Sequence, residues 1–117
     1  MTPIFDRHGR ITAWMNREDI HQLNGAHAAV LHGSNVHGHS GQHLGVFDNG
    51  LFRDHRGAVV AFVAGASGGP LLPLTSIPPL APIPALPPLP AIPAIPPIPA
   101  IPSIGWSSAT WTQFANG

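Results

Sequence analysis

The chain has 117 residues, no Cys, no Lys and a formal net charge of zero at neutral pH with uncharged His. This length limits it to one domain plus an appendage. The lack of Cys excludes disulfides and thiolate metal sites, and the lack of a basic surface argues against nucleic-acid or anionic-membrane partners.

The charges are confined to the first half of the chain. All five basic and five acidic side chains lie between Asp6 and Arg56, and residues 57–117 carry none. Such a long uncharged stretch is expected to pack on something. Its many Pro residues argue against a transmembrane span, because helix hydrogen bonds could not satisfy its carbonyl groups in lipid. No signal peptide is expected at residues 1–6, so the chain would be cytoplasmic or exported by another route.

Residues 1–66 contain one short unit four times, with a period of sixteen residues. Each unit has a turn Gly, a large apolar residue five positions before it and a small residue four positions after it. A fixed period of this kind dictates the architecture of the segment. The turn residues are Gly9, Gly25, Gly41 and Gly57, the large residues are Ile4, Ile20, Val36 and Phe52, and the small residues are Ala13, Ala29, Gly45 and Ala61.

Each unit predicts a strand, a tight turn and a second strand. Gly tolerates the positive φ of hairpin turns, and segments such as 58–63 are rich in β-branched and aromatic residues. Four hairpins in series predict an all-β fold that closes into a shallow symmetric barrel and so has no sheet edges. We expect the four small residues to pack near the barrel axis. The alternative is that each merely packs under a bulky neighbour.

Several segments of the chain resemble the bacterial four-fold beta-flower domain family. They are the run 36–50, the run 53–62, the segments 6–9 and 65–70, a Pro-rich triplet repeat, and the pair Trp106-Ser107. The resemblance covers nearly the whole chain and implies hairpin petals around an apolar channel. It implies no activity, and the family's likeness to Tubby-type barrels points to lipid by fold analogy alone. The family's triplets are Lys-rich and those of this chain are uncharged, which argues against a role at anionic membranes.

A second period follows residues 67–70, a Gly-rich segment that we predict to be a hinge. From 71 to 104, a Leu or Ile stands at every third position and Pro fills many of the others. Pro favours polyproline II, whose three residues per turn would align the branched side chains along one stripe. The predicted assembly stripe consists of Leu71, Leu74, Ile77, Leu80, Ile83, Leu86, Leu89, Ile92, Ile95, Ile98, Ile101 and Ile104.

Three interpretations of this arm compete: a disordered linker, a ligand for SH3-type domains, and a packed polyproline II element. A linker needs no strict period, and the arm lacks the basic residues that orient SH3 ligands. A packed element needs a partner for its stripe, either the barrel's own apolar surface or the stripes of neighbouring chains. We favour self-association as a bundle or filament, because about 105 Å of helix exceeds what one small domain covers.

The predicted function is therefore a non-enzymatic structural protein that forms a homo-oligomer or filament. The alternative is a module that binds a hydrophobic ligand or lipid in the barrel channel. No catalytic residues and no cofactor are predicted. Asp6 and Asp54 share one repeat position, where we expect them to accept hydrogen bonds from turn amides. Ser67 has no base partner, and residues 65–70 lack the Lys and the helix of a phosphate loop.

Eight His residues are the one metal-like feature. His37 and His39 would share one face of a strand. His21 and His37 occupy equivalent positions in adjacent repeats, as do His27 and His43, and a closed barrel would make them neighbours. Clusters of this kind bind zinc or copper, so His37, His39 and His43 are weak metal candidates. Since neither Cys ligands nor an HExxH pattern accompanies them, no metal is predicted.

The C-terminal segment 105–117 is aromatic. Ser107 or Ser108 is expected to cap a short helix that carries Trp111 and Phe114 at i, i+3 spacing. This helix would plug the barrel or contact a neighbouring tail. The predicted organisation is a hairpin-repeat domain at 1–66, a hinge at 67–70, a polyproline II segment at 71–104 and the aromatic segment at 105–117.

Overall fold

The computed structural model describes residues 1–88 and 91–117 and contains a closed antiparallel barrel of eight strands in sequence order. Pairing of Phe5 with Phe62 joins the first strand to the last and closes the meander. The all-β fold of four hairpins predicted from the sixteen-residue period is confirmed. The elements are β1 (Thr2–Phe5), β2 (Ile11–Asn16), β3 (Asp19–His21), β4 (His27–His32), β5 (Asn35–Gly38), β6 (His43–Asp48), β7 (Leu51–Arg53), β8 (Val59–Phe62) and α1 (Trp111–Ala115).

The large apolar residue of each repeat belongs to the barrel core. All four, Ile4, Ile20, Val36 and Phe52, have no exposed surface. Each pairs across its hairpin with the small residue of the same repeat, as Ile4 does with Ala13. This register fits the interpretation in which the small residue packs beside a bulky neighbour. The role of the small residues at the axis stays a prediction.

A β-bulge interrupts every hairpin at the same repeat position. In the first hairpin the register shifts between Ile4 and Phe5, and the other three hairpins shift at the equivalent place. The shift leaves one residue of the second strand without a partner, which re-aims its side chain. These four bulge residues are Thr12, Ala28, Leu44 and Val60.

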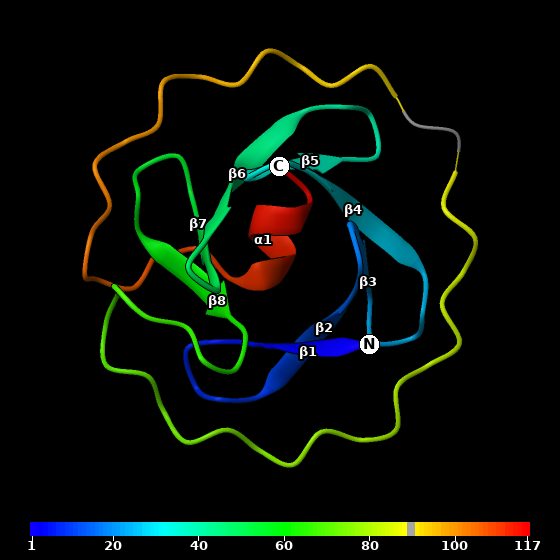
Figure 1. Cartoon of the computed structure of the whole chain (residues 1–117), viewed down its shortest axis with the longest axis horizontal. Coiled ribbons are helices and arrows are strands. Elements are labelled where there is room, and N and C mark those ends of the chain that lie inside the picture. Colours follow the sequence, from blue (N-terminus) through cyan, green and yellow to red (C-terminus); the bar gives the residue numbers. More distant parts are fainter. Residues whose placement is uncertain (89–90) are drawn as a thin grey trace.

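The Pro-rich segment encircles the barrel (Figure 1). Residues 71–88 and 91–104, which we call the belt, form neither helix nor strand. The belt docks on the barrel through four backbone hydrogen bonds of 2.7–3.0 Å, whose donors lie nine residues apart and whose acceptors lie sixteen residues apart. The amides of Ser76, Ala85, Ala94 and Ser103 donate to the carbonyl groups of Gly9, Gly25, Gly41 and Gly57, respectively. The predicted arm thus wraps its own barrel, and its polyproline II conformation stays a prediction.

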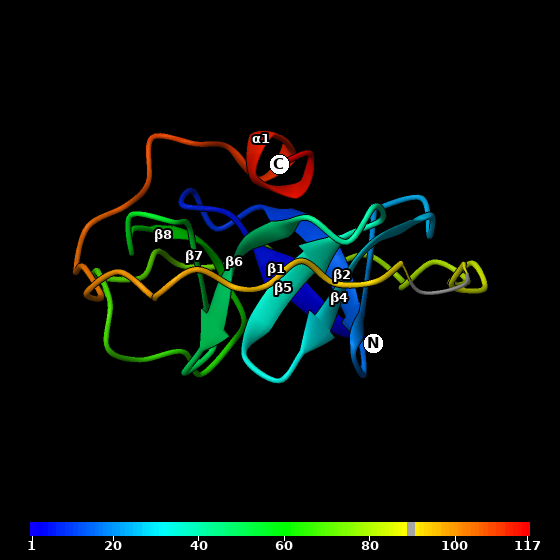
Figure 2. The same cartoon turned by 90° about the horizontal axis from the view of Figure 1, so that it is seen from above.

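Helix α1 lies over one end of the barrel (Figure 2). Its N-cap is Thr110, whose side chain accepts from the amide of Gln113, while Oε1 of Gln113 accepts from the amide of Thr110. The predicted cap at Ser107 or Ser108 is therefore wrong. The capping box places Trp111 and Phe114 against the core, where they are 7% and 5% exposed. The helix therefore covers part of one barrel end, and its predicted contact with a neighbouring tail stays a prediction.

Candidate functional site

The assembly stripe faces away from the barrel. Its eleven described side chains are 79–97% exposed, and Leu89 lies outside the described residues. Of the two partners predicted for the stripe, the barrel's own apolar surface is therefore not used. The belt contacts the barrel through its backbone and through the side chains of Leu72 and Ser76, which lie outside the stripe.

The turn glycines explain this orientation. A Cβ atom at Gly41 would collide with the carbonyl oxygen of Ile92, and the other three turn glycines meet Leu74, Ile83 and Ile101 in the same way. Close approach of two backbones requires Gly. Because these stripe residues direct their carbonyl groups at the barrel, their side chains are left pointing outward.

A second set of equivalent residues supports the belt from beneath. Phe5, His21, His37 and Arg53 recur every sixteen residues, next to the core residues, and all are buried. The Nδ1 atoms of His21 and His37 donate to the carbonyl groups of Gly25 and Gly41, both at 3.1 Å. Arg53 donates at 2.7 Å to Gly57 and at 3.0 Å to Gly68. Sequence reasoning missed this role of Arg53, although aligning the four repeats places it level with the two His residues.

The histidines form two parallel networks between neighbouring hairpins. His27 donates from Nε2 to Oδ1 of Asp19 at 2.9 Å, and its Nδ1 lies 2.8 Å from Nε2 of His39 in a stacked pair. One repeat later, His43 contacts Oδ1 of Asn35 at 3.0 Å, and its Nδ1 lies 2.9 Å from Nε2 of His55. The networks therefore join the second hairpin to the third and the third to the fourth.

These networks correct the predicted histidine neighbours. His21 packs on His27 and His37 packs on His43, rather than each on its repeat equivalent. Strand β5 ends at Gly38, so His39 belongs to the turn and does not share a strand face with His37. Across residues 1–88 and 91–117, no three His, Asp or Glu side chains are grouped to hold a metal ion.

The environment of His43 disfavours its charged form. Burial, followed by the proximity of His55 and His37, lowers the pKa of His43 below its usual range. The neutral ring donates from Nε2 to Asn35 and can then accept at Nδ1 from His55. Protonation at Nδ1 would require His55 to change from donor to acceptor.

The paired aspartates act as predicted. Oδ1 of Asp6 accepts from the amides of His8 and Arg10, and Oδ1 of Asp54 accepts from those of Arg56 and Ala58. Oδ2 of Asp54 accepts in addition from Oγ of Ser107 at 2.5 Å. This last bond fixes the path of the chain from the belt to α1.

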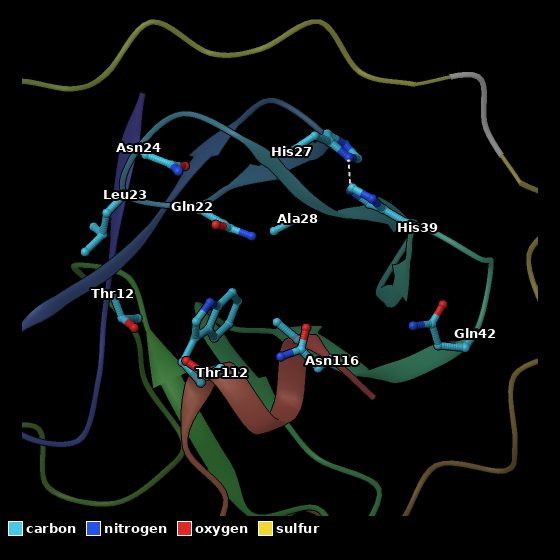
Figure 3. Close-up of a pocket in the computed structure, with 12 residues that line it drawn as sticks. Thr12, Gln22, Leu23, Asn24, His27, Ala28, His39, Gln42, Thr112 and Asn116 are labelled. Atoms are coloured by element: carbon cyan, nitrogen blue, oxygen red, sulfur yellow. Dashed lines mark hydrogen bonds between the residues drawn. The ribbon is translucent and has the colours of Figure 1, made fainter.

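A groove of about 590 Å³ opens between α1 and the turns of the second and third hairpins (Figure 3). In the close-up, Gln22 and Asn24 lie on one side, with the His27–His39 pair at the edge. Thr112 of α1 and Asn116, the C-cap residue of this helix, lie on the other side. No periodic pattern in the sequence predicts this groove, because the position of α1 creates it.

These features define a four-fold symmetric β-barrel of hairpin repeats that is encircled by its own C-terminal belt. The model of the 4-fold beta flower protein family matches residues 2–115, and the chain belongs to this family. Comparison with curated proteins and with solved structures gave no match. Among the helices of the described residues, none has the length and apolar character needed to cross a membrane.

Proposed function

We propose that the protein is a non-enzymatic structural module that associates with copies of itself through the belt. The supporting observation is the exposure of the eleven described stripe residues, at 79–97% each. Complete burial of one Leu or Ile side chain contributes about 1.5–3 kcal/mol. Contiguous apolar surfaces are typical of interaction sites, so a second belt is a suitable partner for this one.

The shape of the molecule restricts how copies meet. The Cα atoms span 37 × 37 × 21 Å, and the belt follows the circumference of this disc (Figures 1 and 2). Stacking discs face to face would leave the stripe in water, whereas contact between rims buries it. We therefore infer side-by-side assembly, in which a row of discs makes a filament and a two-dimensional array makes a sheet.

One rim contact is small. Between successive docking residues such as Ser76 and Ala85 the stripe has three members, Ile77, Leu80 and Ile83. Two convex rims that share about three side chains each bury less than the roughly 1,600 Å² of a standard interface. Assembly would thus depend on each disc contacting several neighbours, and it should be steeply dependent on concentration.

The alternative, a hydrophobic ligand in the barrel channel, has less support. The large apolar residues of all four repeats form one core cluster with Trp111 and Phe114, which cover half of one end of the barrel. A ligand in the channel would have to displace these side chains, at a cost of several kcal/mol.

Exposed stripe residues allow a clean test. The triple variant Ile77→Ser, Leu86→Ser, Ile95→Ser removes one stripe residue from each of three belt sections, and all three side chains are more than 90% exposed. A contact between two variant rims lacks one stripe side chain from each copy, which lowers its binding free energy by about 3 kcal/mol. Assembly should therefore require about 100-fold more protein. Sedimentation velocity and electron microscopy measure this.

The control is Leu23→Ser, which removes an exposed apolar side chain of the barrel (50% exposed). The Leu23→Ser variant should assemble like the wild type. Both this control and the triple variant should keep the melting temperature of the wild type. A wild-type chain that stays at 12.2 kDa at high concentration rejects the proposal. Columns of stacked discs would reject the rim geometry.

A further inference from the structure

One end of the barrel is only half covered. Helix α1 contacts β6 and β8, where it covers the bulge residues Leu44 and Val60, which are 3% and 4% exposed. The equivalent bulge residues of the first two hairpins, Thr12 and Ala28, remain partly exposed and line the groove. The sequence follows this division, because the covered positions have large apolar side chains and the open positions have a small hydroxyl and a methyl group.

The open half is a pocket of the size of a small-molecule site. Its volume of about 590 Å³ falls within the range of roughly 300–1,000 Å³ that is usual for such sites. Both walls contribute polar groups, from the turns of two hairpins and from α1 (Figure 3). Amide and hydroxyl side chains dominate: Gln22, Asn24, Gln42, Asn116, Thr12 and Thr112.

The pocket, in the part of the chain that the structure describes, offers a ligand no carboxylate, ammonium or guanidinium group of its own. Among the described residues that line it there is no Asp, Glu, Lys or Arg, and its titratable groups are His27 and His39. These two imidazoles are already bonded to each other at 2.8 Å. An ionic ligand would therefore lose hydration without gaining an opposite charge, which is costly. The lining favours a neutral ligand.

Two of the amides are held in fixed orientations by their own turns. Oδ1 of Asn24 accepts from the amide of Ala26 at 3.0 Å. Oε1 of Gln42 accepts from the amide and the hydroxyl of Ser40, at 3.2 and 2.5 Å. Since the oxygen atoms are engaged, the NH₂ groups are the available hydrogen-bond donors. Donors that are oriented before binding lower its entropic cost.

We propose that this groove binds a neutral polyhydroxylated ligand of the saccharide type. Hydroxyl groups both donate and accept, so they match a wall of amides and Thr hydroxyls. The C–H faces of a sugar ring match the apolar surface that Leu23, Ala28 and Trp111 contribute. An apolar ligand would instead leave the amides without partners, which costs about 1–3 kcal/mol for each group. The site is separate from the belt and independent of self-association.

The test is calorimetric and NMR titration of the full chain with two neutral probes, maltose and N,N′-diacetylchitobiose, and with glucose 6-phosphate as the charged comparison. At least one neutral probe should bind with a Kd of about 1 mM or tighter and shift the side-chain amide signals of Asn24 and Gln42. Glucose 6-phosphate should bind more weakly.

The variants Gln22→Ala and Thr112→Ala, one on each wall, remove exposed side chains and should each weaken binding about 5- to 10-fold. Thr75→Ala, an exposed belt residue outside the groove, should leave affinity unchanged. The proposal is overturned by the absence of binding of both neutral probes at about 10 mM, by preference for the phosphorylated sugar, or by wild-type affinity of both lining variants.

Discussion

The guanidinium group of Arg53 in β7 donates a 2.5 Å hydrogen bond to the carbonyl oxygen of Ser103. The same side chain donates to Gly68, which precedes the belt, whereas Ser103 is the last docking residue of the belt. One buried cation therefore attaches both ends of the belt to the barrel. Its acceptors are carbonyl oxygens, so it holds the two ends without a carboxylate partner.

Replacing Arg53 should loosen both ends of the belt. Arg53→Met keeps the apolar part of the side chain but removes three charge-assisted hydrogen bonds, to Gly57, Gly68 and Ser103. We expect a loss of about 3 kcal/mol in the free energy of unfolding, measured by urea denaturation. Arg10→Met, at an exposed position, should change it by less than about 0.5 kcal/mol. Equal effects of the two variants would contradict the attachment role.

Comparison of substitutions at two glycines distinguishes the cost of backbone strain from the cost of losing contact with the belt. Gly33 and Gly41 both have positive φ, at 61° and 83°, but a Cβ at Gly33 would have no atom within 4 Å, whereas one at Gly41 would collide with the belt. Gly33→Ala should cost about 1 kcal/mol from strain alone. Gly41→Ala should cost at least about 1 kcal/mol more and should speed hydrogen exchange of the Ala94 amide. Identical exchange of that amide in the two variants would argue against the docking contact.

Acid should destabilise the fold through His43. Because its pKa is lowered in the folded state, the unfolded chain binds more protons below the unfolded value of about 6.5. The stabilising contribution of neutral His43 is thus complete above that pH and is lost as the pH falls toward the folded pKa. Urea denaturation at several pH values between about 7.5 and 5, which bracket the pKa of an unperturbed His, would measure the loss in the free energy of unfolding.

The neighbouring repeat supplies the matched variant. Asn35 occupies the position that Asp19 occupies next to His27. Asn35→Asp should raise the pKa of His43, because a nearby carboxylate favours the protonated ring, and should flatten the loss of stability in acid. If the substitution leaves the pH dependence of stability unchanged, a group other than His43 is responsible for the loss of stability in acid.

The observed cap of α1 can be distinguished from the cap that the sequence predicts. Thr110→Ala removes the capping box and should lower stability by about 1 kcal/mol. Ser108→Ala changes an exposed hydroxyl and should have no measurable effect. Thermal unfolding followed by circular dichroism compares the two. A larger loss in Ser108→Ala would reinstate the predicted cap.

Most of the barrel could be predicted from residues 1–66, because a hairpin repeat with Gly at each turn leaves few alternatives to closure. The course of the arm could not, although a signal was present. Segments 76–84, 85–93 and 94–102 each begin with Ser or Ala, continue with Ile or Leu and two Pro residues, and end in Ile-Pro. This nine-residue unit contains three triplets, and its first residue provides the amide that docks on a turn. Because Leu or Ile recurs at every third position, the longer nine-residue repeat is difficult to recognise in the sequence.

The two periods, the closed hairpin barrel, the row of Leu and Ile at every third position and the short aromatic helix could be predicted from the sequence, because they follow from residue spacing and local conformational preferences. Tertiary structure alone decided which way the stripe faces, that Arg53 joins the belt ends, how the histidines pair, and which half of the barrel mouth α1 covers. These outcomes depend on contacts between residues far apart in the chain, such as Ser76 with Gly9, which are 67 positions apart. The geometry of these contacts forms only when the belt docks on the barrel, because each nine-residue unit of the belt spans one sixteen-residue repeat of the barrel.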